Sequence, residues 1–288
     1  MWKLSIATCG YAQDCTIEDY LSRIRKAGYD AVDIDLYNYY DDIMHPSRVS
    51  WARGVSAAAA DAGLIIGQAH AQMGNVANIE LPYESPAEIY YRNIEVCGIM
   101  GCKELVFHPL IATTIIDADE YNKLMDYNIR WFQELIEPAK THSVRICIEN
   151  AVDIRPHAIA TPFTTASDIM ALVDGIDEST IGICLDTGHA HIASQDIADM
   201  IRTFNKRLRV LHLHDNFGMI TPVYPDHHLF PGVGTIDFSS VFNALKEINF
   251  CGTINIEPGR LERLPINVRD AVITGGALVA KAYIDDIC

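Results

Sequence analysis

Eight short apolar runs alternate with amphipathic stretches along the chain, and this alternation constrains the fold more than any other feature of the sequence. Each run has the length and composition of a β-strand, and together they cover residues 3–8, 29–36, 64–70, 104–108, 144–149, 180–186, 208–212 and 252–257. Helical patterns fill 16–28, 47–63, 86–101, 119–141, 167–174, 196–204, 238–248 and the residues from 267 onwards. Eight such units without a break in composition predict one parallel (β/α)8 barrel, a TIM barrel, as a single domain over residues 1–288.

Six consecutive runs, from the third to the eighth, end in an ionisable side chain. These residues are His70, His108, Glu149, Asp186, His212 and Glu257, and His189 follows Asp186 in a segment that we interpret as a loop. The carboxyl ends of all strands of a parallel barrel meet on one face, where the sites of this fold lie. A single residue of this kind is usually a core histidine or an acid that caps the next helix. Its repetition on six strands favours a shared site instead.

Three carboxylates in one barrel mouth, Glu149, Asp186 and Glu257, would repel one another unless a cation neutralised them. A divalent metal removes this repulsion, and mixed carboxylate and imidazole ligands suit Mn, Zn, Co or Fe. The segment Asp226-His227-His228, in the long loop 213–235, either completes a further metal shell or is a polar surface loop. We interpret the other histidines as solvent-exposed or supporting groups, namely His45, His142, His157, His191, His214 and His227.

Composition limits the compartment and the partners. The chain has 49% hydrophobic and 21% charged residues, no apolar run of membrane-spanning length and no basic leader, so we expect a cytoplasmic protein without a membrane partner. Its eight cysteines form no CxxC pair, which argues against a thiolate zinc site and a disulfide framework. The formal net charge of −16 and the lack of a dense basic run disfavour nucleic acid as a partner.

With these motifs the chain resembles the xylose-isomerase-like TIM barrel superfamily, which includes sugar isomerases and epimerases, inosose isomerases and dehydratases, and endonuclease IV. The resemblance covers essentially the whole chain. Its specific parts are Ile148–Asn150, Cys184–His189, His212–Asp215, Asp226–His228 with Pro231–Gly234, and Ile256–Pro258. Relatives are often dimers or tetramers, so a homo-oligomer is compatible with the resemblance.

In the isomerase and epimerase branch, the resemblance implies one divalent metal held by Glu149, Asp186, His212 and Glu257. It also implies that Glu149 and Glu257 transfer a proton next to a carbonyl, through an enediolate, while His189 contacts the substrate. The substrate class is a sugar, sugar acid, sugar phosphate or cyclitol. Ketose epimerases carry an arginine and a second glutamate where this chain has 216–218 and 153–155, which weakens the case for a free ketohexose.

The endonuclease IV branch is the alternative, as a multinuclear zinc phosphodiesterase acting on abasic DNA. Its trinuclear zinc site is similar to a set that this sequence contains in full: His70, His108, Glu149, Asp186, His189, His212, Asp226, His228 and Glu257. We therefore expect one metal and allow up to three. The loop 37–42 is aromatic and acidic, where an enzyme that grips a duplex would need arginines. A barrel that binds a sugar without converting it is the third hypothesis.

Overall fold

The computed structural model describes residues 2–8, 11, 15–73, 83–111, 117–152, 162–176, 178–218, 226–259 and 261–287. Eight strands form one sheet in the order β7-β6-β5-β4-β3-β2-β1-β8. They are β1 (Leu4–Ala7), β2 (Ala31–Asp35), β3 (Ile65–His70), β4 (Glu104–Phe107), β5 (Arg145–Glu149), β6 (Ile181–Asp186), β7 (Leu208–His212) and β8 (Ile254–Ile256). The predicted TIM barrel is confirmed.

All neighbouring strand pairs in this sheet are parallel. The sheet closes on itself just beyond the end of β7, where Leu213 forms a parallel bridge with Ile256 of β8. The Leu213 amide donates to the Asn255 carbonyl at 2.9 Å, and the Glu257 amide donates to the Leu213 carbonyl at 3.1 Å. The barrel is therefore tied together at the carboxyl ends of its strands, which is the end that carries the predicted site.

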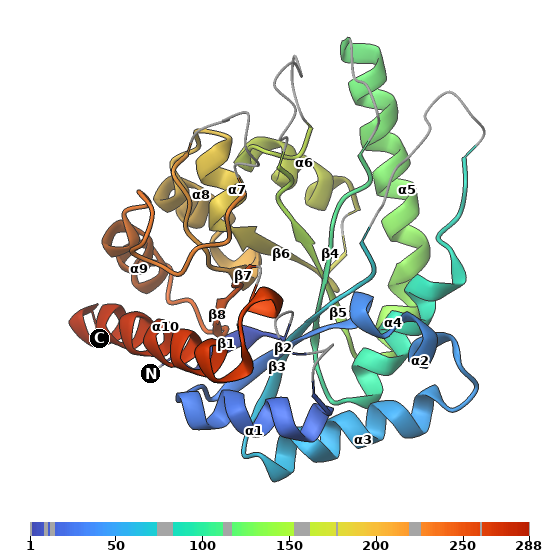
Figure 1. Ribbon diagram of the computed structural model, residues 1–288. Coiled ribbons are helices and arrows are strands. Elements are labelled where there is room, and N and C mark those ends of the chain that lie inside the picture. Colours follow the sequence, from blue (N-terminus) through green and yellow to red (C-terminus); the bar gives the residue numbers. More distant parts are fainter. Residues whose placement is uncertain are drawn as a thin grey trace.

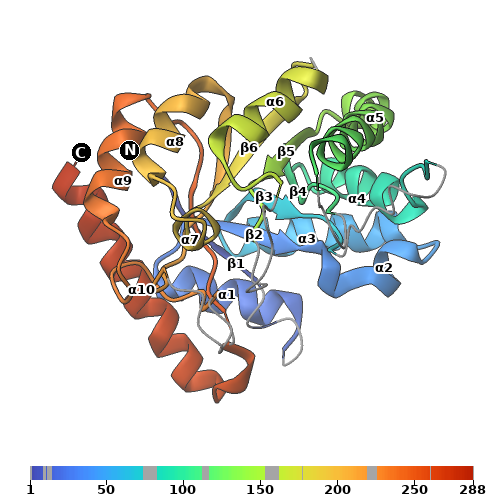
Figure 2. The same ribbon diagram turned by 90° about the horizontal axis from the view of Figure 1, so that it is seen from above.

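Helices cover the outside of the barrel (Figures 1 and 2). They are α1 (Ile17–Ala27), α2 (Tyr40–Met44), α3 (Arg48–Asp61), α4 (Glu88–Ile99), α5 (Ala118–His142), α6 (Ala166–Ile176), α7 (Thr187–Ile192), α8 (Ile197–Phe204), α9 (Phe238–Glu247) and α10 (Ile266–Ile287). Short 3-10 turns are η1 (Leu36–Tyr39), η2 (Asn205–Arg207) and η3 (Leu261–Arg263). Helix α7 differs from the rest, because Figure 2 shows it inside the outer ring of helices.

The ends of α1 show how local sequence sets these elements. The Thr16 hydroxyl accepts a hydrogen bond from the Asp19 amide, and Gly28 takes a left-handed conformation with φ of 103°. The predicted loop over 37–42 is wrong, because η1 and α2 occupy this segment. Helices this short show no clear apolar periodicity from which to predict them. The predicted features at 153–155 and at His157 lie outside the described residues.

The interior of the barrel is filled in layers. Val106, Cys147, Cys184 and Val210 form a buried cluster of their own, separate from the main core around them. Each lies two residues before one of the predicted site residues, namely His108, Glu149, Asp186 and His212. Since alternate side chains of a strand point to the same face, the site forms the next layer above this apolar one. Cys147 and Cys184 are free, buried thiols, and the Cys147 thiol donates to the Glu104 carboxylate at 3.3 Å.

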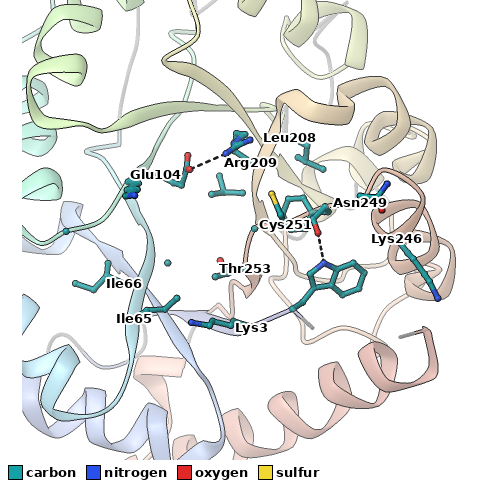
Figure 3. A pocket seen from close by; sticks show the side chains of 17 residues that line it. Lys3, Ile65, Ile66, Glu104, Leu208, Arg209, Lys246, Asn249, Cys251 and Thr253 are labelled. Carbon is teal, nitrogen blue, oxygen red and sulfur yellow. Dashed lines mark hydrogen bonds and ion pairs between the residues drawn. The ribbon is translucent and has the colours of Figure 1, made fainter.

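A pocket of about 850 Å³ lies at the opposite end of the barrel (Figure 3). Its lining includes Lys3, Arg209, Thr253 and Glu104, the first residue of β4. Arg145 and Arg209 approach the Glu104 carboxylate at 2.7 and 3.9 Å. This pocket therefore marks the amino ends of the strands, far from the strand-end histidines and acids. Within the described residues, no helix is long and apolar enough to cross a membrane.

Candidate metal centre

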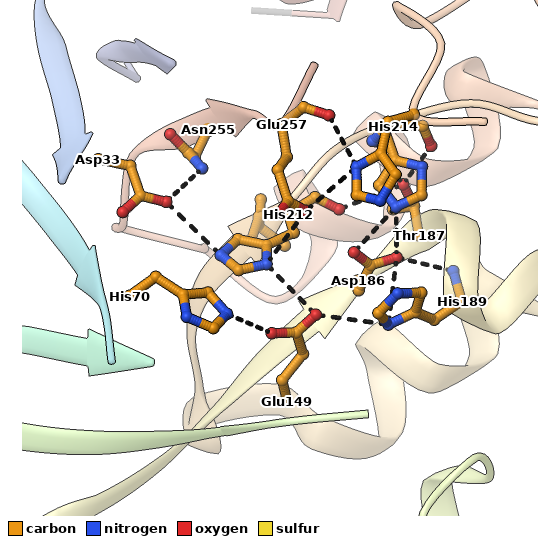
Figure 4. Close-up of polar contacts among 12 residues, drawn as sticks. Asp33, His70, Glu149, Asp186, Thr187, His189, His212, His214, Asn255 and Glu257 are labelled. Carbon is orange, nitrogen blue, oxygen red and sulfur yellow. Dashed lines mark hydrogen bonds and ion pairs between the residues drawn. The ribbon is translucent and has the colours of Figure 1, made fainter. Parts of the chain in front are cut away.

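The four residues expected to hold one metal converge at the carboxyl end of the barrel (Figure 4). His212 Nδ1, at the end of β7, lies 3.3 Å from Glu149 Oε1 and 3.3 Å from Glu257 Oε2. Asp186, His212 and Glu257 each place a ligand atom within 4.8 Å of the others. Glu149, Asp186 and His212 are almost fully buried. The barrel thus gathers three carboxylates around one imidazole.

Asn150 fixes the relative position of two of these strand ends. Its side-chain amide donates to the Asp186 carbonyl at 3.0 Å, and its side-chain oxygen accepts from the Asp186 amide at 2.8 Å. The Asn150 carbonyl lies 2.9 Å from His189 Nδ1. The asparagine of the motif Ile148–Asn150 therefore holds β5, β6 and the His189 ring in one arrangement.

His70 and His108 form a second group with Glu149. Their Nε2 atoms lie 3.4 and 3.2 Å from Glu149 Oε2, and 3.2 Å from each other. The other oxygen of this carboxylate, Oε1, faces His212 and His189 at 3.3 and 3.4 Å. Glu149 therefore connects two sets of imidazoles through its two oxygens. His108 lies one residue beyond β4, and its side chain is more exposed than that of His70.

The loop residues Asp226 and His228 belong to a third group, which also contains His189 and His214. Asp226 Oδ2 lies 3.0 Å from His228 Nε2 and 3.7 Å from His189 Nε2. Asp226 is only 4% exposed. Of the two alternatives for this loop, the structure places its described part over the strand ends and not on the outer surface.

One sequence interpretation of this region is wrong. His189 lies in helix α7 and not in a loop, and Asp186 caps this helix by accepting the His189 amide at 2.7 Å. Of the two roles left open for His214, the structure agrees with the supporting one and not with exposure to solvent, because His214 is fully buried, with Nε2 2.9 Å from the Asp186 carboxylate and its ring stacked on His228 at 3.9 Å between centroids. A Cβ atom at Gly188 would collide with the His214 ring. The signal for His214 was its place two residues after His212, which puts both on the same side of the chain.

Asp215 organises the loop that carries Asp226 and His228. Its carboxylate accepts hydrogen bonds at 2.7 to 3.1 Å from the backbone amides of Asn216, Gly232, Gly234 and Ile236. Its backbone pairs with Leu229 in both directions, at 2.7 and 2.9 Å. Asp215 and the Pro231–Gly234 segment therefore have a structural role, since a Cβ atom at Gly234 would strike the Asp215 carboxylate.

Burial and opposite charge shift the pKa values of the site in a consistent pattern. Burial alone would raise the pKa of Glu149, but His212 and His108 hold it well below its usual range. Burial alone would lower the pKa of His212, but Cys184, Glu257 and Glu149 raise it well above its usual range. Burial alone would also lower the pKa of His228, but Glu257 and Asp226 raise it to about 9. Protonated imidazoles therefore neutralise the carboxylates of the metal-free protein.

The donor set fits a divalent metal. His212 Nδ1, Glu149 Oε2 and Glu257 Oε2 are buried atoms without a hydrogen-bond partner among the described residues. Buried polar atoms normally have such a partner, and a coordinated cation supplies an equivalent one. Carboxylate oxygens with imidazole nitrogens are ligands for Mn, Zn, Co or Fe. A cation held here would take the place of the protons that the imidazoles carry.

A comparison with protein families identifies the family to which the chain belongs. Residues 21–272 match the family described as xylose isomerase-like TIM barrel. This match covers most of the sequence, so the chain belongs to the xylose isomerase-like TIM barrel family, as its motifs predicted.

Curated relatives are of several kinds. The chain is 32% identical over 153 residues to the uncharacterized protein MJ1311 of Methanocaldococcus jannaschii, which covers 52% of this chain and 47% of that protein. It is 23% identical over 182 residues to an inosose isomerase of Bacillus licheniformis, covering 63% of each. A probable endonuclease 4 of Mycoplasma genitalium is 26% identical over 144 residues, covering 47% of this chain and 46% of that protein. The chain thus spans between about half and two-thirds of the length of these relatives.

Solved structures share the fold along nearly the whole chain. A D-tagatose 3-epimerase-like protein superposes with a TM-score of 0.76 at 21% identity, covering 99% of this chain and 98% of that one. A D-psicose 3-epimerase, solved in the presence of D-fructose, gives a TM-score of 0.74 at 15% identity, covering 98% and 99%. These similarities show that the chain shares its fold with these two proteins along nearly its whole length.

Proposed function

We propose that the protein is a divalent-metal-dependent isomerase or epimerase of a sugar, sugar acid, sugar phosphate or cyclitol. The observation that carries this proposal is the position of two glutamates, Glu149 and Glu257, each 3.3 Å from the same nitrogen of His212. Inosose isomerases among the relatives and sugar epimerases among the similar structures support the substrate class. The acidic charge and the absence of a dense basic run also favour a small substrate over nucleic acid.

Glu149, Asp186, His212 and Glu257 would hold the metal. A bound divalent cation would supply a Lewis acid that polarises the carbonyl and hydroxyl oxygens of the substrate. Glu149 and Glu257 would act as the acid and base. One carboxylate takes the proton from the carbon next to the carbonyl, and the other donates a proton to the opposite face, or to the neighbouring carbon. In the metal-free protein, His212 and His108 hold the pKa of Glu149 well below its usual range against burial, so this carboxylate is already ionised before a metal binds.

Surrounding residues would bind and orient the sugar. His189 and His108 border the glutamates, and Tyr37 presents its ring to His70 edge-on at 5.5 Å. Phe217 is 49% exposed and packs its ring against His227 near the loop over the site. Such rings offer an apolar wall to the face of a sugar, while the histidines offer hydrogen bonds to its hydroxyl groups.

Replacement of either glutamate tests these roles. We expect Glu149→Gln and Glu257→Gln each to lower turnover by at least about 10³-fold with the barrel intact, because the amide can neither accept nor donate the transferred proton. The assay is the exchange of substrate carbon-bound protons with solvent deuterium, followed by NMR across ketoses, uronates and inososes. Glu104→Gln, at the opposite end of the barrel, is the matched control and should retain activity. Near-wild-type exchange in either site variant would remove the assigned roles.

A second function is favoured by one observation: all nine residues of the multinuclear set belong to overlapping groups of possible metal ligands. The relatives named probable endonuclease 4 support the same alternative. This alternative is a multinuclear zinc phosphodiesterase that cleaves abasic DNA. It requires cleavage of an abasic-site duplex that weakens steeply as salt rises. Intact duplex at every salt concentration, with zinc supplied, would eliminate it.

A further inference from the structure

Asp33, the third residue of β2, is a buried carboxylate beneath the candidate metal centre. It is 1% exposed and faces the interior of the barrel (Figure 4). Its Oδ2 atom accepts hydrogen bonds from Gln68 Nε2 at 2.9 Å and from Asn255 Nδ2 at 3.0 Å, and it lies 3.5 Å from His212 Nε2. Residues of three strands, β3, β7 and β8, therefore each place a side-chain nitrogen near the same oxygen of Asp33.

The two nitrogens of His212 have different surroundings. Nδ1 faces the glutamates Glu149 and Glu257, whereas Nε2 faces Asp33. A metal ligand must present a lone pair, and a neutral imidazole has one nitrogen with a lone pair and one with a proton. The arrangement therefore assigns the proton to Nε2, beside Asp33, and the lone pair to Nδ1, beside the other metal ligands.

The neighbours of Asp33 indicate that its carboxylate is the acceptor that faces the His212 N–H. Gln68 Nε2 also approaches the Leu211 carbonyl at 3.3 Å, which fixes this end of the amide as the donor. No lysine or arginine contacts Asp33 within the described part of the chain. A buried carboxylate without a cationic partner is strongly unfavourable, so the His212 N–H is the group that compensates it. The 3.5 Å separation is longer than an ordinary hydrogen bond, and His212 Nε2 has no hydrogen-bond partner among the described residues, so its attraction to the Asp33 carboxylate is electrostatic.

We propose that Asp33 is a positioning residue, which holds His212 with its proton on Nε2 and with Nδ1 turned to the metal. The inference rests on the proposed function, because it requires a metal bound by His212. Carboxylates behind metal-bound histidines orient the ring and strengthen the ligand. Gln68 and Asn255 hold the Asp33 carboxylate in place, so the support extends across three strands of the barrel.

NMR of the protein labelled with ¹⁵N-histidine tests the tautomer directly. The sample is the wild-type protein loaded with Zn²⁺, which is diamagnetic, and the His212→Asn variant identifies the His212 signals by their loss. We expect the nitrogen that bears the proton to be Nε2 and the metal-bound nitrogen to be Nδ1. Metal bound at Nε2, or a proton found on Nδ1, would overturn the inference.

Metal affinity tests the contribution of Asp33. Competition with a chelator for Mn²⁺ or Co²⁺ should show about 10- to 100-fold weaker binding by Asp33→Leu, the range typical of lost support behind a ligand. Asp33→Asn keeps an oxygen facing Nε2 without the charge, so it should lose less affinity than Asp33→Leu. It also serves as the test if the leucine variant does not fold. Wild-type affinity in the folded Asp33→Leu variant, or in Asp33→Asn together with a Zn²⁺-bound Nε2, would refute the positioning role.

A control variant separates affinity from stability. Tyr29, two residues before the amino end of β2, is also fully buried, and its hydroxyl donates to the Ile273 carbonyl of α10 at 3.0 Å. Tyr29→Phe should lower the melting temperature and leave metal affinity within about threefold of wild type, a smaller change than the loss typical of a residue that supports a metal ligand. A wild-type protein that binds no metal would contradict the proposed function itself. Metal affinity that does not change when Asp33 is replaced would contradict only this inference.

Discussion

Single atoms decide how closely the site can pack. Gly188 lies in the first turn of α7, directly against the buried ring of His214, which in turn contacts the Asp186 carboxylate at 2.9 Å. The absence of a side chain at this position lets the helix carrying His189 approach the segment after β7. In the motif Asp186-Thr187-Gly188-His189, the glycine is thus required for packing.

Adding one methyl group at two glycines tests this packing. We expect Gly188→Ala to destabilise the protein by about 1–3 kcal/mol through overpacking against His214. Gly54 lies in α3 with nothing within 4 Å of an added Cβ, so Gly54→Ala should stabilise by about 0.5–1 kcal/mol. Urea denaturation measures both. Equal effects of the two substitutions would show that His214 does not restrict the position.

At the scale of elements, the candidate site includes a loop in which one carboxylate accepts several backbone hydrogen bonds. Asp215 accepts four backbone amides of the segment 216–236 and so keeps Asp226 and His228 over the strand ends. None of the eight strands of the barrel depends on these bonds. The loop and the barrel should therefore respond separately to mutation.

Asp215→Ala should open this loop and leave the barrel folded. The variant removes the acceptor of four amides, and unmade buried hydrogen bonds cost about 1–3 kcal/mol each until water reaches them. Hydrogen exchange should accelerate at the amides of Gly232, Gly234 and Ile236 and remain slow in the strands. Asp237→Ala is the control, because Asp237 caps α9 from the same loop through the Ser240 amide. Unchanged exchange in Asp215→Ala would show that other contacts hold the loop.

At the scale of the whole molecule, the metal-free protein should lose stability as pH rises from about 6.5 to 9. Although burial opposes their charge, nearby carboxylates raise the pKa of His228 to about 9 and the pKa values of His189 and His212 well above the usual range. A raised pKa means that the folded state binds the proton more tightly, so the stabilisation is complete below the unfolded value of 6.5 and is lost above it.

Other groups do not reverse this trend above pH 6.5. Burial alone would raise the pKa values of Asp186 and Glu149, but the neighbouring histidines hold them below their usual range. Such carboxylates contribute their full stabilisation above about pH 5. Thermal melts of chelator-treated protein across this range measure the effect. Because the metal replaces the protons of the imidazoles, saturating Mn²⁺ should flatten the decline. A melting temperature that rises between pH 6.5 and 9 without metal would contradict the charge pattern.

The sequence predicted the barrel and the converging strand ends because both follow from periodicity. Residues such as Glu149 and His212 end apolar runs, and parallel strands must bring their ends together. His214 and Asp33 were not assigned to the site, because their partners Asp186 and His212 lie on other strands. The short helices η1, α2 and α7 were missed because one or two helical turns are too short to show apolar periodicity. Which residues meet across a barrel is determined by strand register, and one sequence does not display it.

The most direct test of the central claim is the metal content of the protein, purified without chelator or histidine tag, with Asp226→Ala measured beside it. Mass spectrometry of the digested samples counts each metal per chain. The isomerase-type centre of Glu149, Asp186, His212 and Glu257 predicts about one divalent metal per chain, unchanged in Asp226→Ala. Roughly two or three zinc ions per chain, with one lost in Asp226→Ala, or no metal at all, would contradict it.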